Sequence, residues 1–231
     1  SRYTSRGVQS GGGRMRGIEL EFTPPSRIRG AHPQTLWGYL VTESPKLQYR
    51  RELLPSREGE LLALDWYDFR TEGPLVIVQH GLEGSSRAPY VRRLADQASR
   101  AGMGVVALNA RGCGGSPNET VQSYHASWTA DLEVVVETLA ERFPGRPLFL
   151  VGYSLGGSQF GNYLGRCASR VPESVRGAYL ISAPIALDRA IGTLDRGWNK
   201  MYTTKFLGSL GRKMLGKAVR HPEHRWRALR A

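Results

Sequence analysis

The sequence predicts an α/β fold, in which a mostly parallel sheet carries helices on both faces. Short, continuous apolar runs of the kind that buried parallel strands need recur along the chain, and segments with helical apolar spacing separate them. The chain has 231 residues, of which 40% are hydrophobic and 23% are charged. That length suits one large domain or two small ones, and that apolar content excludes a disordered chain.

The expected elements begin with two strands and continue as alternating strand and helix. Residues 47–54 and 61–67 are rich in Leu, Trp and Tyr, and Pro55 and Gly59 between them indicate a hairpin. Residues 74–80, with the sequence PLVIVQH, form the first apolar run that predicts a buried strand. Further buried strands are expected at 104–109, 147–152 and 175–182, and helices at 91–101, 128–143 and 159–168.

Composition divides the chain into a tail, a core and a cap segment. Residues 1–16 contain four Arg among Gly and Ser without an apolar period, which predicts a disordered tail. Residues 17–187 contain the alternating elements and are expected to form the core of the fold, in incomplete form. Residues 188–231 are polar, basic and punctuated by Gly, and we expect short amphipathic helices there. Met15 directly precedes the patterned stretch, so we expect either a natural start at Met15 or a processed, flexible N-terminus.

The net charge of +12 lies at the two ends of the chain and not on its body. Residues 1–30 hold six Arg and two Glu, a net +4, and residues 189–231 hold eleven basic and two acidic residues, a net +9. The body between them, residues 31–188, has 15 basic and 16 acidic residues. A nucleic-acid-binding domain usually carries its basic surface on the folded body, so we expect no nucleic-acid partner.

Cysteine spacing and hydropathy exclude several further classes of protein. The two cysteines, Cys113 and Cys167, are too few for a small secreted domain stabilised by disulfide bonds. Their spacing supports neither a metal site nor a redox pair. The Gly-rich stretch 109–118 lacks the spacings of phosphate-binding loops. No apolar run is long enough to span a membrane, and no signal peptide opens the sequence. We therefore expect a cytoplasmic protein without an integral membrane segment, with both thiols reduced.

The segment that carries chemistry is residues 152–156, which form a G-x-S-x-G motif between an apolar strand and a helical run. A strand-to-helix turn this tight leaves no room for side chains two residues before and after the serine, so Gly152 and Gly156 support it. The turn presents the Ser154 hydroxyl at the carboxyl edge of the sheet, beside a helix N-terminus that favours negative charge. We expect Ser154 to be a catalytic nucleophile; the alternative is a glycine-rich turn with an incidental serine.

The loop after the first buried strand is expected to complete an oxyanion hole. A nucleophilic serine of this type needs two backbone N–H donors for the oxyanion, one from the residue that follows it and one from an earlier loop. The first is Leu155, and the second is expected to be Leu82, with Gly81 and Gly84 allowing the backbone to turn toward the substrate. His80 opens the same loop, and we expect it to hydrogen-bond the loop as a structural residue and not to act as the catalytic base.

These motifs, in this order and spacing, resemble the YheT-like branch of the α/β-hydrolase superfamily, a family of carboxylesterases and related hydrolases. The resemblance runs from about Phe22 to Leu187. It implies an α/β-hydrolase fold with an eight-stranded sheet, a Ser-Asp-His triad and hydrolysis of a small-molecule ester, including lipid-like esters, with no metal or organic cofactor. It also implies a helical cap from about Leu187 onward and places Gln34 and Thr35 at the edge of the site. The shared segments are Pro24-Pro25, 31–36, 80–84, 111–115, 123–125 and 152–157.

The acid and the base of such a triad are not found where the family pattern requires them. In this superfamily they follow later strands of the sheet, and the sequence shows neither of those strands. Four residues follow the serine in the right order: Asp188, Asp195, His221 and His224. We expect them on the cap surface, because they lie in polar segments without a preceding apolar strand, although Asp188 stands shortly after the last strand, where a few relatives take their acid.

The expected explanation is a chain that ends before the fold does. Two strand–helix units of roughly 30 residues each, with the rest of a cap, amount to roughly 80–110 residues beyond Ala231. A sheet that stops at its sixth strand exposes an apolar edge, so we expect this chain alone to be poorly soluble and nearly inactive. Three interpretations stay open: ester hydrolysis by the full-length protein, acyl transfer by the same groups, and a non-catalytic binding protein of the same fold. The sequence leaves substrate identity and oligomeric state open.

Overall fold

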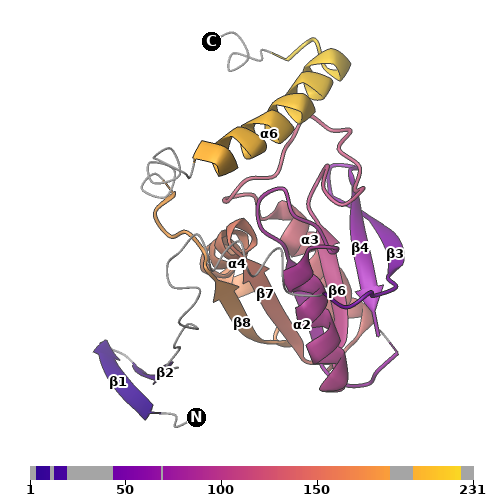
Figure 1. The fold of residues 1–231 in the computed structure, drawn as a ribbon. Helices are drawn as coiled ribbons and strands as arrows, with labels where there is room; N and C mark the ends of the chain where they lie inside the picture. The colour runs from indigo at the N-terminus through magenta and orange to yellow at the C-terminus, as the bar shows by residue number, and fades with distance from the viewer. Residues whose placement is uncertain (1–3, 11–12, 20–43, 69, 188–199, 225–231) are drawn as a thin grey trace. The chain divides into compact units, whose positions relative to one another are not determined.

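A computed structural model describes residues 4–10, 13–19, 44–68, 70–187 and 200–224 of the chain (Figure 1). The chain forms two compact units, Ser1–Glu43 and Ser44–Ala231. Several segments singled out in the sequence lie outside the described residues: Pro24-Pro25, 31–36 with Gln34 and Thr35, Asp188 and Asp195.

The described residues of the first unit form an antiparallel strand pair. β1 (Thr4–Ser10) pairs with β2 (Gly13–Glu19), with Val8 opposite Met15 and Ser10 opposite Gly13. The sequence predicts a disordered tail over 1–16, and this pairing differs from it. Two glycines stand between the strands in the sequence, and glycine is the residue type that a two-residue hairpin connection favours.

The second unit is built on a six-stranded sheet with the strand order β3-β4-β6-β5-β7-β8. The four strands from β5 to β8 run parallel, while β3 pairs antiparallel with β4 and β4 antiparallel with β6. The predicted mostly parallel sheet with an opening hairpin is confirmed. The strands are β3 (Arg50–Pro55), β4 (Leu61–Tyr67), β5 (Leu75–Gln79), β6 (Gly104–Asn109), β7 (Leu148–Tyr153) and β8 (Val175–Ile181).

Helices cover both faces of this sheet, as the sequence predicts (Figure 1). α2 (Pro89–Arg100) packs on one face, while α3 (Ala130–Arg142) and α4 (Leu155–Arg166) pack on the other. A short 3-10 turn, Ala168–Arg170, follows α4. Among the described helices, none combines the length and the apolar character that crossing a membrane requires.

The side chains of the central strand β5 pack into two hydrophobic cores, one on each face of the sheet. Val76 and Val78 join the core beneath α2, whereas Leu75 and Ile77 join the larger core beneath α3 and α4. Successive strand side chains point to opposite faces, so a strand buried on both faces needs an unbroken apolar run. All five residues of β5 are buried.

β8 forms an edge of the described sheet, and its last residues are exposed. Tyr179 is 63% exposed, Leu180 43% and Ile181 40%. An exposed apolar edge strand is a site for association with other chains. The poor solubility expected for this chain therefore stays a prediction with a structural basis.

The C-terminal part of the described chain is one long helix, α6 (Lys200–Arg220), where the sequence predicts several short ones. Gly208, Gly211 and Gly216 suggest breaks because glycine costs about 1 kcal/mol relative to alanine inside a helix. The helix continues through them, and side chains on one of its faces anchor it: Lys213 contacts Glu83, and Lys217 contacts the backbone at 121–122.

A buried arginine ties the loop after β6 to α3. The Arg111 side chain is 0% exposed and donates two hydrogen bonds to the Asp131 carboxylate, at 2.9 and 2.7 Å. Its remaining donors reach Glu58 at 3.1 Å and Thr120 at 3.0 Å, and its guanidinium stacks over Trp128 at 5.0 Å. Since a buried charge is tolerated only with such partners, this arginine fixes the loop in place.

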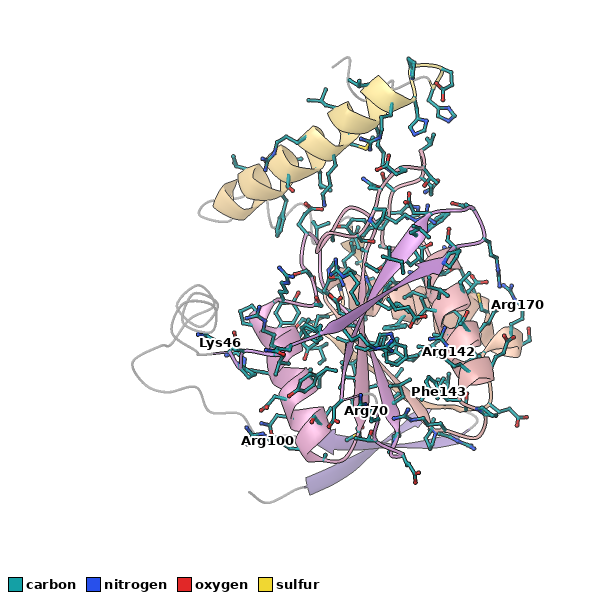
Figure 2. The ribbon with its side chains drawn as sticks, turned by 90° about the vertical axis from the view of Figure 1, so that its right-hand side faces the viewer. Lys46, Arg70, Arg100, Arg142, Phe143 and Arg170 are labelled. Atoms are coloured by element: carbon teal, nitrogen blue, oxygen red, sulfur yellow. The ribbon has the colours of Figure 1, made fainter. Side chains whose placement is uncertain are left out.

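We expect Asp131→Ala to lower the free energy of unfolding by about 3–5 kcal/mol, because it leaves the buried Arg111 charge without its main partner. Urea denaturation measures the loss. Asp96→Ala is the matched control: it breaks an ion pair with Arg100, which is 72% exposed on α2 (Figure 2), and is expected to cost about 0.5 kcal/mol or less. Equal losses of unfolding free energy in the two variants would contradict the view that burial makes the Arg111–Asp131 pair the more important one.

Candidate active site

Ser154 stands at the sharp turn between β7 and α4. Its backbone angles are φ 51° and ψ −118°, a left-handed conformation that costs a non-glycine residue about 1–3 kcal/mol. The Ser154 N–H donates to the carbonyl of Ile181 at the end of β8, at 2.8 Å, which helps hold the turn. The serine is exposed, whereas Gly152 and Gly156 on either side of it are buried.

The two glycines of the motif are required by close backbone contacts. A Cβ on Gly152 would lie 2.5 Å from the carbonyl oxygen of Gly156, and a Cβ on Gly156 would lie 2.5 Å from the carbonyl oxygen of Gln79. Both distances are too short for real carbon–oxygen contacts. The first turn of α4 can therefore press against the end of β5 only because these side chains are absent.

The loop that follows β5 passes directly beside the serine. A Cβ on Gly81 would lie 3.2 Å from the Ser154 Cβ, so the two backbones are close neighbours. The Gly81 N–H donates to the Tyr90 hydroxyl at 3.1 Å, and the Gly84 N–H donates to the Gly81 carbonyl at 3.0 Å. These bonds close a tight turn around Leu82.

Two backbone amides near the serine are candidates for binding an anion. Leu155 is the first residue of α4, where N–H groups have no partner within the helix and the helix dipole favours negative charge. The Leu82 N–H donates no hydrogen bond to any of the residues that the structure describes. The structure thus places Leu82 and Leu155 on the two segments that meet at Ser154.

His80 bridges two loops at the carboxyl edge of the sheet. Its Nε2 accepts the Ala110 N–H at 3.1 Å, which leaves Nδ1 to donate to the Gly81 carbonyl at 2.6 Å. Burial lowers the pKa of this imidazole to about 4, so the ring is neutral at physiological pH. Both ring nitrogens are used in these bonds, which fits the structural role expected from the sequence.

Asp65 fixes the far end of the same loop, and sequence reasoning missed it. Its carboxylate accepts the Ser86 hydroxyl at 2.5 Å and the Asn109 side-chain amide at 2.9 Å, and it pairs with Arg51 through two bonds of 2.7 Å. Burial alone would raise the pKa of the Asp65 carboxyl, but the hydrogen bonds hold it below its ordinary value. A lone carboxylate inside an apolar strand, LLALDWY, was the signal that could have found it.

No acid or base joins Ser154 in the described part of the chain. The Ser154 hydroxyl forms no hydrogen bond with any described residue, and His221 instead bonds the carbonyl of Glu119 at 2.6 Å. His224 follows His221 beyond the end of α6, and the two rings are 6.4 Å apart. The described residues also contain no group of three or more His, Cys, Asp or Glu side chains that could hold a metal ion.

Comparisons with curated proteins identify relatives along most of the chain. It is 29% identical over 205 residues to the Escherichia coli protein named "Putative esterase YheT", covering 87% of this chain and 60% of that protein. It is 33% identical over 147 residues to Phospholipase ABHD3 of Mus musculus, covering 60% of this chain and 36% of that protein. The chain thus spans 60% or less of the length of these relatives.

A solved structure shares the fold, and a family model matches the sequence. The esterase Pf2001 of Pyrococcus furiosus superimposes with a TM-score of 0.55 at 20% identity, covering 83% of this chain and 70% of that one. The model of the alpha/beta hydrolase fold family matches residues 74–231, which is more than half of the chain and includes the strand-to-helix turn at Ser154. On these grounds the chain belongs to the alpha/beta hydrolase fold family.

Proposed function

We propose that this chain carries the nucleophile and the oxyanion hole of a serine hydrolase that cleaves carboxylic esters. The observation that carries the proposal is the left-handed backbone of Ser154, φ 51°, at an exposed turn beside two candidate amide donors. Strain of this kind persists where the surrounding structure enforces it, and it concentrates at functional sites.

In the proposed reaction the Ser154 oxygen attacks the carbonyl carbon of the ester. The carbonyl oxygen becomes an oxyanion held by the N–H groups of Leu82 and Leu155, and the carbon–oxygen bond to the alcohol then breaks. The serine proton leaves with the alcohol through a base, and water releases the acid from the acyl-enzyme. We place that base and its carboxylate partner outside the described residues.

The relatives suggest the class of ester. Besides the two proteins above, the chain is 36% identical over 176 residues to the Monoacylglycerol lipase of Saccharomyces cerevisiae, covering 75% of this chain and 34% of that protein. Phospholipase and lipase are names of enzymes for lipid esters. We therefore propose an ester with an apolar, lipid-like chain as the substrate of the full-length protein.

Acyl transfer is a second candidate function. A Saccharomyces cerevisiae relative, 37% identical over 131 residues, is named Medium-chain fatty acid ethyl ester synthase/esterase 2, covering 56% of this chain and 28% of that protein. Synthesis and hydrolysis use the same nucleophile and oxyanion hole and differ only in whether an alcohol or water takes the acyl group. Product analysis with ethanol present separates the two.

We expect Ser154→Ala to abolish labelling of the full-length protein by a fluorophosphonate probe and to lower hydrolysis of p-nitrophenyl butyrate by at least about 10³-fold. Gel fluorescence and absorbance are the measurements. Ser158→Ala is the control, since the Ser158 hydroxyl lies one turn further along α4 and donates to the Pro184 carbonyl at 3.0 Å. Equal labelling of the wild type and Ser154→Ala would exclude this nucleophile.

We expect Gly156→Ala to lower both the melting temperature and the hydrolysis rate, because the added methyl group would collide with the Gln79 carbonyl and displace the α4 N-terminus. Thermal denaturation and initial rates measure the two effects. Gly165→Ala, in the same helix with nothing within 4 Å of an added Cβ, is expected to keep the activity and to stabilise the protein by about 0.5–1 kcal/mol. A fully active Gly156→Ala enzyme would contradict the role of this contact.

A further inference from the structure

Glu83, the residue directly after Leu82, lies where four segments that are distant in sequence meet. The cluster around its side chain, called here the Glu83 cluster, joins the loops after β5 and β6, the segment before α3, and α6. Its members are Glu83, Cys113, Tyr124, Ser209 and Lys213. The loop that contains a candidate oxyanion donor is thereby in direct contact with the helix at the end of the described chain.

The carboxylate of Glu83 is fully engaged. Its Oε1 accepts the Lys213 ammonium at 2.7 Å and the Tyr124 hydroxyl at 2.8 Å, and its Oε2 accepts the Ser209 hydroxyl. The side chain is only 10% exposed. Burial would raise the pKa of this carboxyl, but the hydrogen bonds from Lys213, Ser209 and Tyr124 hold it below its ordinary value, so it stays ionised.

One of these side chains, Tyr124, also bonds a strained backbone. Glu83 has φ 54°, a left-handed conformation that is uncommon for residues other than glycine. The Tyr124 hydroxyl accepts the Glu83 N–H at 3.0 Å while it donates to the Glu83 carboxylate, so one side chain holds both parts of this residue. Because the peptide planes are linked, the conformation of Glu83 helps set the position of Leu82 just before it.

α6 is attached to the body at separable points along one face. Ser209 and Lys213 reach Glu83, whereas Lys217, four residues further, donates to the carbonyls of Val121 and Gln122 at 3.2 and 2.6 Å. Only the first attachment touches the loop beside Ser154. The second anchors the same helix to the stretch just before Tyr124 without touching Glu83 itself, and it therefore provides a control for attachment of the helix in general.

We propose that Glu83 is a positioning residue that couples the docking of α6 to the assembly of the oxyanion hole. With Lys213 and Ser209 on its carboxylate, the loop keeps the strained turn that places the Leu82 N–H beside Ser154. Without them a buried negative charge loses its main partner, and the loop relaxes toward an ordinary backbone conformation. The inference rests on the proposed function of this site, and it makes the helix a condition for activity.

Hydrogen exchange tests the coupling without relying on catalysis. The amides of Glu83 and Gly84 are protected by bonds to the Tyr124 hydroxyl and the Gly81 carbonyl. In Lys213→Met we expect their exchange in the full-length protein to accelerate by about tenfold or more, since a hydrogen bond to a charged group is lost. In Lys217→Met we expect faster exchange in α6 and unchanged exchange at these two amides. Equal exchange at Glu83 and Gly84 in wild type and Lys213→Met would overturn the proposal.

Steady-state kinetics on p-nitrophenyl butyrate tests the consequence. We expect Lys213→Met and Glu83→Gln to lower kcat by about 10- to 100-fold, less than the 10²–10³ that loss of an oxyanion donor costs, with KM changed by less than about threefold. Lys213→Arg, which keeps the charge, is expected to restore most of kcat, and Lys217→Met to stay within about twofold of wild type.

A loss of kcat in Lys217→Met equal to that in Lys213→Met would overturn the proposal, because attachment of the helix in general would then matter and not the contact with Glu83. A wild-type protein without Ser154-dependent turnover would refute the proposed function. The exchange at Glu83 and Gly84 still decides the coupling in that case.

Discussion

The site depends on one close contact, the approach of the first turn of α4 to the end of β5. At Gly156 the carbonyl oxygens of Gln79 and His80 occupy the space where a side chain would begin. Since α4 starts directly after Ser154, and the loop of Leu82 continues directly from β5, this contact sets the distance between the serine and that loop. The rest of the sheet holds these two chain segments in register, with β5 and β7 paired side by side.

Buried polar side chains bond the loops at this edge of the sheet to one another. Asp65, His80 and Arg111 are each nearly inaccessible to solvent, and each bonds a segment distant in sequence. Buried polar groups are costly unless all are bonded, so such a network tolerates few alternative arrangements. Hydrogen bonds among buried polar groups thus restrict the loops at the edge of the sheet that carries Ser154, although Ser154 itself is exposed.

The sequence was sufficient for the sheet and for the turn at Ser154, because those signals are local. Apolar runs mark the buried strands, and the spacing of Gly152 and Gly156 marks the turn. The Glu83 cluster could not be predicted, since Glu83 and Lys213 stand 130 residues apart and neither lies in a pattern that requires the other. The length of α6 was missed for the same reason: its attachments to the body offset glycines that a local rule treats as breaks.

Because the imidazole of His80 is buried and neutral, the free energy of unfolding of the protein depends on pH. Its pKa is about 4 in the folded chain against an ordinary value of 6.5, so between these pH values the unfolded chain binds a proton that the folded chain does not. The contribution of His80 to stability is therefore complete above pH 6.5 and declines on acidification, by about 1.4 kcal/mol for each unit, until about pH 4. The two hydrogen bonds by which His80 joins the loops after β5 and β6 thus stabilise the fold fully above pH 6.5 and less in acid.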